Sequence, residues 1–297
     1  MTKTISAIRP IEKVSRKKIR ISNLFISVIL VFMAVIVLLP VVFIAANSLM
    51  DEREIMKSYG GLSESGKRIM PHIIPERATL KQYAEVFYMK PDYLIKFWNS
   101  MLITLAIVAG QVFVSCMGGY GFAKFNFPLK NVIFFLFVVI MIMPYQVTLV
   151  PQYIILDKMG LIGSYAAVIL PGMVAPFGIF LLTQVFSSVP DNIIEAAKID
   201  GANNIQILFK IIFPYGKMGI AALFILSFID NWNMVEQPLV FLSDIRKYPL
   251  SIFLTNINLF NLGVAFVCGI LAMLPVVIIF LYLKESLVYG IETSSLK

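Results

Sequence analysis

Cysteine and histidine are nearly absent from this chain of 297 residues, which has two cysteines and one histidine. Cys116 and Cys268 both lie inside apolar segments, a setting that favours neither a disulfide framework nor a zinc site. The single His72 cannot form a cluster of histidine ligands. We therefore expect no metal site and no cofactor bound by this chain.

Charged residues are also scarce, at 14% of the sequence, whereas hydrophobic residues make up 59% and the mean hydropathy is +0.86. This composition excludes an ordinary soluble domain. The net charge of +8 does not indicate nucleic-acid binding, because the basic residues lie at the ends of apolar runs and form no single groove-sized patch. The composition predicts a polytopic membrane protein.

Catalytic motifs are missing as well. The chain has no GxxxxGK[ST] phosphate loop, and Gly118-Gly119-Tyr120-Gly121 lacks the lysine and hydroxyl of a nucleotide loop. Asp230 has no acidic partner within an apolar run, and no HExxH sequence is present. We expect no catalytic residue, and ATP hydrolysis by this route would need another chain.

Six apolar runs are long enough to cross a bilayer core of about 30 Å as helices. The fold class expected is all-α, with six transmembrane helices. The first run is interpreted as a retained span, because no small-residue cleavage site follows it. The expected spans are Leu24–Ala46, Phe97–Tyr120, Val132–Leu156, Ser164–Phe186, Lys217–Val240 and Leu262–Leu283.

Prolines 144, 171, 176 and 275 fall within or beside these spans, where they mark either packing kinks or breaks along a solute path.

Lys and Arg positions predict the orientation. Six basic residues between Arg9 and Arg20 precede the first span, which indicates a cytoplasmic N-terminal tail at 1–20. Six spans then place the loop at about 188–216 in the cytoplasm and the loop at about 50–96 outside. The outer loop has eight basic and seven acidic residues, a balance typical of a folded, solvated segment. A transmembrane domain at 21–290 and a short C-terminal tail at 291–297 complete the expected organisation.

The loop at 188–216 contains a polar island between two apolar runs. Pro190 and the capping residues that follow it predict the start of a helix, and Gly201 predicts its end. Four apolar residues are expected on one side of this helix: Ile193, Ile194, Ala197 and Ile199. The pattern predicts a short helix-turn-helix at the membrane surface, and an amphipathic connection without further function is the simpler alternative.

The spacing Glu195-Ala196-Ala197-x3-Gly201, followed by Ile211-x-Phe213-Pro214, resembles the EAA coupling loop of permease subunits of bacterial ABC importers. The family often has Leu where Phe213 stands. The resemblance implies that this loop docks into the ATPase subunit. Small side chains at Ala196 and Ala197 would permit close contact, and Glu195 would pair with a basic residue.

Gly201 would supply the turn, and Pro214 would set the entry to the fifth span. Asp200 would brace the turn or remain a plain surface carboxylate.

Further segments, in order along the chain, are similar to the maltose-type carbohydrate permeases. They are Asn99-Ser100, Gly119-Tyr120-Gly121-Phe122-Ala123-Lys124, Met143-Pro144, Gly160-Leu161, Trp232-Asn233 and Pro238-Leu239. The resemblance covers residues 20 to 290. Two departures from the family pattern bear on the substrate and on any C-terminal contact: Met234-Val235 replaces an acidic-aromatic pair, and the usual glycine-rich C-terminal tail is missing.

The resemblance implies a subunit of a binding-protein-dependent ABC importer in the bacterial inner (plasma) membrane, carrying a sugar or oligosaccharide. Implied partners are a second homologous permease subunit, a cytoplasmic ATPase dimer that holds ATP and Mg, and an extracytoplasmic solute-binding protein. Membrane lipid surrounds the complex, and no nucleic acid is expected.

Polar residues in and near the spans are the candidates for contact with the solute, because they are costly to expose to lipid. Trp232 offers a flat face on which a sugar could stack, although Trp is also a common interface anchor. The candidates are Trp232, Asn233, Asn231, Asp230, Gln146 and Asn99.

Two other functions remain open. One is an importer of the same architecture for another solute, such as a polyamine or glycerol phosphate. The other is a channel or membrane scaffold, which would leave the Glu195 loop without a role.

Overall fold

The computed structural model describes residues 21–59, 74–89, 91–255 and 262–295, with no side chains described at 21–24, 91 and 286–295. The tail at 1–20 and His72 lie outside the described residues. In these ranges the backbone is helical apart from turns, and strand pairing is limited to an isolated bridge between Met50 and Ala78. The all-α prediction is confirmed.

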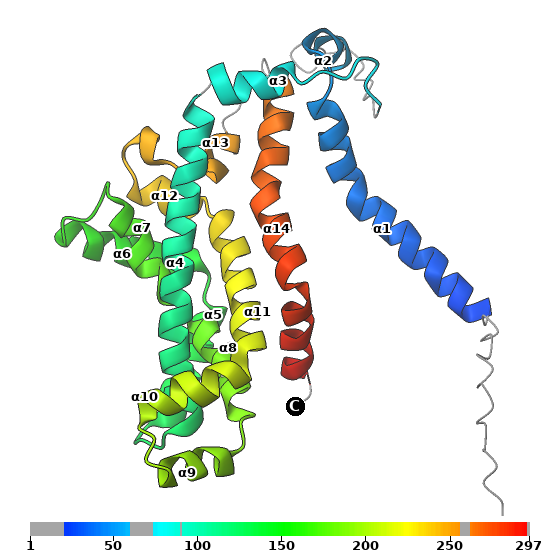
Figure 1. Cartoon of the computed structure of the whole chain (residues 1–297). Helices are drawn as coiled ribbons and strands as arrows, with labels where there is room; N and C mark the ends of the chain where they lie inside the picture. The colour runs from blue at the N-terminus through cyan, green and yellow to red at the C-terminus, as the bar shows by residue number, and fades with distance from the viewer. Residues whose placement is uncertain (1–20, 60–73, 90, 256–261, 296–297) are drawn as a thin grey trace, which may run out of the picture. The chain divides into compact units, whose positions relative to one another are not determined.

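The elements follow in chain order (Figure 1). The bounds are α1 Ile21–Ser48, α2 Glu52–Tyr59, α3 Lys81–Ala84, π-helix η2 Glu85–Met89, α4 Pro91–Lys124, α5 Lys130–Ile142, α6 Tyr145–Lys158, α7 Tyr165–Gly172, α8 Pro176–Ser187, α9 Asp191–Ile199, α10 Asn204–Ile207, π-helix η3 Leu208–Ile212, α11 Phe213–Trp232, α12 Glu236–Phe241, 3-10 helix η4 Ile245–Lys247, α13 Leu250–Thr255 and α14 Leu262–Ser295.

The chain divides into two compact units, residues 1–43 and 44–297. The described part of the first unit is most of α1, a single helix with Pro40 in its interior. In the second unit α4 and α14 run between two ends, one formed by α2 and α3 and the other by α9 and α10 (Figure 1). We call these the α2 end and the α9 end.

Five described helices are long and apolar enough to cross a membrane, and a bent pair supplies a sixth candidate. The first, second and last agree with the expected spans: Phe25–Ser48, Asp92–Lys124 and Leu262–Glu285. The backbone of α14 continues as a helix to Ser295, through most of the expected C-terminal tail.

The sequence predicts one continuous helix for the third span, and the structure differs. The span is broken between α5 and α6, which meet at 105°. Met143 has an extended backbone with ψ 133°, because the residue before a proline is driven out of the α region and Pro144 has no N–H to donate. The fourth span is also interrupted, at residues 173–175 between α7 and α8.

The expected end of the fifth span at Val240 is wrong. The apolar helix runs from Asn204 to Trp232, and a turn separates it from α12. Pro238 lies in the first turn of α12, where a proline is tolerated, whereas in a continuous helix it would remove a hydrogen bond and clash with the preceding turn.

Three apolar clusters hold the second unit together. The α9-end cluster joins α4, α8 and α11 to the loop at 188–216. The Trp232 cluster joins η2, α4, α11, α13 and α14. A third joins α4, α6, α7 and α12. Since α4 contributes to all three, it is the central element of this unit.

Candidate functional site

One side of α9 packs against the bundle and the other is open. Ile194 is 5% exposed and belongs to the α9-end cluster, and Ala197 packs partly against it. Ile193 and Ile199 are 41% and 87% exposed, so the expectation that all four apolar residues share one side is wrong. Within so short a helix, only positions three or four apart share a narrow face.

The side chains of Glu195, Ala196 and Asp200 are exposed on α9 and its end. The open surface also contains large apolar side chains that a free helix would not normally expose to water: Ile199, Ile205 and Phe209. The exposed residues of α9, α10 and η3 therefore form a mixed apolar and charged surface, with Lys198 and Lys210 beside the acidic side chains, as a docking surface would.

The turn after α9 is a Schellman motif. The N–H of Ala202 donates to the carbonyl of Ala197 at 2.9 Å, and the N–H of Gly201 donates to that of Lys198 at 3.0 Å. Gly201 has φ +82°, a left-handed conformation that glycine adopts without strain. The carboxylate of Asp200 makes no side-chain hydrogen bond among the described residues, so backbone groups form the turn.

A capping box begins α10, and the sequence analysis missed it. Asn203 Oδ1 accepts from the Gln206 N–H at 2.8 Å, and Gln206 Oε1 accepts from the Asn203 N–H at 2.9 Å. The spacing Asn-x-x-Gln was a readable signal. Together with the Schellman motif, the box fixes the direction of the chain on both sides of the turn.

Pro214 is the second residue of α11, which continues a helix that begins upstream at Asn204. The π-helix η3 leads directly into α11, and Pro214 lies at its start within one continuous apolar helix from Asn204. The wider turn of the π-helix lies immediately before Pro214, whose missing N–H interrupts the regular α-helical hydrogen bonds.

The start of α9 differs from the expectation that Asp191 or Asn192 would cap it. The N-cap residue is Pro190, and no side-chain cap is formed. Instead Oδ1 of Asp191 accepts from Nζ of Lys124 on α4 at 2.7 Å, and the Val189 carbonyl accepts from the same Nζ at 2.5 Å. Hydrogen bonding and charge from Lys124 hold the pKa of the Asp191 carboxyl below its usual range.

Trp232 lies inside the Trp232 cluster, at 4% exposed. Its ring stacks on Phe228 with centroids 5.5 Å apart and meets Phe97 edge to face at 5.7 Å. Its Nε1 donates to the Ala272 carbonyl at 3.1 Å. In this conformation, the indole packs α11 against α4 and α14.

Three other candidates lie at the end of α11. Asp230 is exposed, whereas the amides of Asn231 and Asn233 donate to carbonyls of their own helix, those of Ser227 at 2.7 Å and Ile229 at 2.8 Å. The carboxylate of Asp230 therefore remains the most available of this group for a polar ligand.

Gln146 and Asn99 lie apart from that group. Gln146 on α6 donates to Glu236 on α12. Asn99 donates to the carbonyls of Arg246 and Tyr248, at 2.7 and 3.1 Å, and accepts from Tyr165 Oη at 2.9 Å. No two of the six candidate side chains, all of which lie in the described ranges, share a hydrogen bond.

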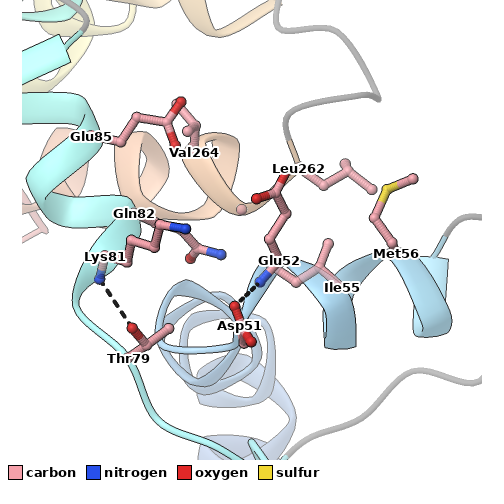
Figure 2. Close-up of a pocket in the computed structure, with 11 residues that line it drawn as sticks. Asp51, Glu52, Ile55, Met56, Thr79, Lys81, Gln82, Glu85, Leu262 and Val264 are labelled. Carbon is pink, nitrogen blue, oxygen red and sulfur yellow. Dashed lines mark hydrogen bonds between the residues drawn. The ribbon is translucent and has the colours of Figure 1, made fainter.

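A small pocket of about 40 Å³ lies where α2, α3 and the start of α14 meet (Figure 2). Gln82 Nε2 donates to the Met50 carbonyl at 2.7 Å, and its buried Oε1 has no hydrogen-bond partner among the residues that the structure describes. A Cβ on Gly263 would lie 2.4 Å from Gln82 Nε2, so a larger residue here would displace the Gln82 side chain between α3 and α14. The described parts of the 50–96 loop therefore form a folded platform at the α2 end.

Comparisons with known proteins agree on one family. Residues 103–291 match the family described as binding-protein-dependent transport system inner membrane component. The arabinooligosaccharides transport system permease protein AraQ of Halalkalibacterium halodurans is 30% identical over 228 residues, covering 75% of this chain and 81% of that protein.

The sn-glycerol-3-phosphate transport system permease protein UgpE of Escherichia coli is 30% identical over 207 residues, covering 67% of this chain and 74% of that protein. Among solved structures, a chain of a bacterial ABC transporter involved in the import of the acidic polysaccharide alginate superposes with a TM-score of 0.75. The alignment covers 91% of this chain and 97% of that one at 22% identity, a likeness of fold.

Proposed function

This chain belongs to the family of inner membrane components of binding-protein-dependent transport systems, and from that premise we propose that it carries a sugar or oligosaccharide as the transmembrane subunit of an ATP-driven importer. As a member of this family, the chain is a transporter subunit of an inner membrane. A separate ATPase would hydrolyse ATP, with Mg bound there. We further propose a cytoplasmic N-terminus and assembly with a second, related permease.

The observation that carries the coupling role is the open side of α9. Glu195 and Ala196 are exposed on a helix whose other side is anchored through Ile194, and the Gly201 turn holds its end. A short anchored helix of this kind can transmit a push or a pull to the long helices behind it. We propose that the ATPase binds Glu195 and Ala196 there, with the half-buried Ala197 and the exposed Asp200 at the edge of the contact.

Co-purification from cells that express the chain with its neighbouring genes tests this role. Wild type is expected to retain an ATPase, and Glu195→Lys to lose it, because a carboxylate buried against a basic partner becomes a repelled ammonium. Glu52→Lys is the matched control, since Glu52 is exposed at the α2 end. Absence of an ATPase from the wild-type preparation would overturn the proposed function.

The sugar assignment rests on the relatives named for arabinooligosaccharides. Relatives named for sn-glycerol-3-phosphate, at 26–35% identity, favour glycerol phosphate as a second candidate. Titrating the purified binding protein with arabinooligosaccharides, glycerol 3-phosphate and a polyamine by calorimetry separates these cargoes. Tight binding of the phosphate ester alone would replace the sugar.

A further inference from the structure

Side chains of α4 fasten the loop at residues 242–249 to the α2-end half of that helix. The buried Lys96 donates from Nζ to the Ile245 carbonyl, and Asn99 donates to the next carbonyl and to that of Tyr248. The hydroxyl of Ser100 accepts from the N–H of Leu250 at 2.7 Å. Residues from a single turn of α4 thus hold the backbone of this loop.

A neighbouring element reinforces the same contact. Tyr165 at the start of α7 donates to Oδ1 of Asn99, and Lys247 donates to the Gly163 carbonyl at 2.7 Å. Lys96 is 6% exposed as a whole residue, and its Nζ donates to the Ile245 carbonyl. The side chains of Ile245 and Arg246, in contrast, are 70% and 88% exposed. The backbone of the 242–249 loop is therefore fixed while two of its side chains face outward.

The opposite end of α4 is fastened in the same manner. Lys124, the last residue of the helix, reaches the Val189 carbonyl and Asp191, directly before and at the start of α9. Its side chain is 6% exposed, whereas that of Asp191 is 78% exposed. A second buried lysine of α4 thus binds a backbone carbonyl, this time in the candidate docking loop.

The helix between these two contacts is continuous. The 26 residues from Asn99 to Lys124 span about 38 Å at the helical rise. No proline interrupts them, and close contacts support them at Gly118 and Gly119, where Ile179 and Leu182 of α8 lie against the helix. Displacement of one end of α4 therefore displaces the other.

We propose that α4 is a rod that couples the 242–249 loop to the α9 docking loop, with Lys96 and Lys124 as the positioning residues at its two ends. The proposal rests on the proposed function, in which α9 meets the ATPase. Through α4, docking of a solute-loaded binding protein at the α2 end would change the rate of ATP hydrolysis by the ATPase bound at the α9 end.

The test measures ATPase activity of the full complex in lipid nanodiscs, with and without solute-loaded binding protein. Lys96→Met and Lys124→Met are each expected to lower the stimulated-to-basal ratio by roughly fivefold or more, a typical coupling between sites. Because the two residues act in series, the double variant is expected to be no worse than either single variant.

Matched controls use the same substitution. Lys158→Met removes an exposed lysine at the end of α6, and Lys130→Met removes a half-buried lysine at the α9 end that donates to the Phe125 carbonyl in its own loop. Both are expected to keep the wild-type ratio. Loss of stimulation in either control, retention in either rod variant, or multiplied losses in the double variant would overturn the rod.

A distance measurement makes the test independent of activity. Spin labels at the exposed Asn192 and Arg246 are expected to keep one narrow distance distribution with and without ATP, and to broaden in Lys124→Met. A distance that changes with nucleotide in wild type would overturn the rod. If the wild-type chain binds no ATPase, the proposed function is wrong. If the wild-type complex is stimulated normally and the Lys96→Met and Lys124→Met complexes are stimulated equally well, only the rod is wrong.

Discussion

The side-chain amide of Gln146 on α6 donates to both carboxylate oxygens of Glu236 on α12, at 2.8 and 3.0 Å, across 90 positions of sequence. Both side chains are exposed, so the contact contributes little to stability, on the order of 1 kcal/mol or less. It nonetheless orients a carboxylate beside a break in the third span. A neutral, polar solute would find both donors and acceptors here.

We therefore expect Gln146→Leu to raise the KM of solute uptake severalfold, because it removes the donor that orients Glu236. The apparent Tm in detergent should change little. Uptake into proteoliposomes across a range of solute concentrations measures the first quantity, and a thermal melt the second. A large fall in Tm with unchanged KM would instead assign this pair to folding.

Gly201→Ala is expected to destabilise the turn after α9 by about 1–2 kcal/mol, the cost of a left-handed backbone for a residue with a Cβ. No atom lies within 4 Å of the added methyl group, so backbone strain is the cause. Gly201→Asn should cost less, since asparagine tolerates this conformation better. The fraction of complex that retains the ATPase measures the effect, and equal losses in both variants would contradict this reason.

Gly119→Ala is expected to loosen the contact between α4 and α8. The added Cβ would lie 2.8 Å from that of Leu182 and 3.1 Å from the backbone nitrogen of Thr183, which cannot move aside as a side-chain tip can. Overpacking of this kind costs about 1–3 kcal/mol. Gly121→Ala is the control, because nothing lies within 4 Å of its position. In thermal melts, Gly119→Ala should lower the Tm, and Gly121→Ala should not.

Trp232→Ala is expected to destabilise the bundle by about 3–5 kcal/mol, as large-to-small changes in a packed core do. Trp232→Phe keeps an aromatic ring between Phe228 and Phe97 and loses the bond to Ala272, so it should cost less. If Trp232→Ala lost uptake at an unchanged Tm, the ring would be a solute contact that another conformation exposes.

The contact of Lys124 with Asp191 predicts a dependence on pH. Because the folded pKa of Asp191 lies below its usual value near 4, its contribution is present above about pH 4 and is lost as the pH falls through the lowered pKa. Asp191→Asn should therefore reduce Tm at pH 7 and have no effect at the acidic end of the range. A constant difference between variant and wild type from pH 3 to pH 7 would contradict this assignment.

Sequence alone predicted the helical class, four of the six membrane spans and the glycine turn at residue 201, because each depends on local pattern. It placed the third and fifth spans incorrectly, since hydropathy averages over a window and Pro144 and Pro238 change direction within one.

The contacts of Lys96 and Lys124 could not be predicted, because their carbonyl partners lie 149 and 65 residues away and no local rule pairs a lysine with a distant carbonyl. The burial of Trp232 was not predicted either, because the sequence placed the end of this span at residue 240, whereas the helix ends at residue 232.

The break between α5 and α6 has a consequence for how the protein is made. Each helix end there leaves backbone carbonyls or amides without intrahelical partners, and hydrocarbon cannot satisfy them. Polar groups cluster beside the break, where Tyr145 Oη and Gln152 Oε1 lie 3.0 Å apart and Thr148 donates to the Tyr145 carbonyl. A newly inserted chain that met only lipid at this point would keep those groups exposed. It would then be recognised by membrane quality control until another protein surface or a water-filled passage covered them.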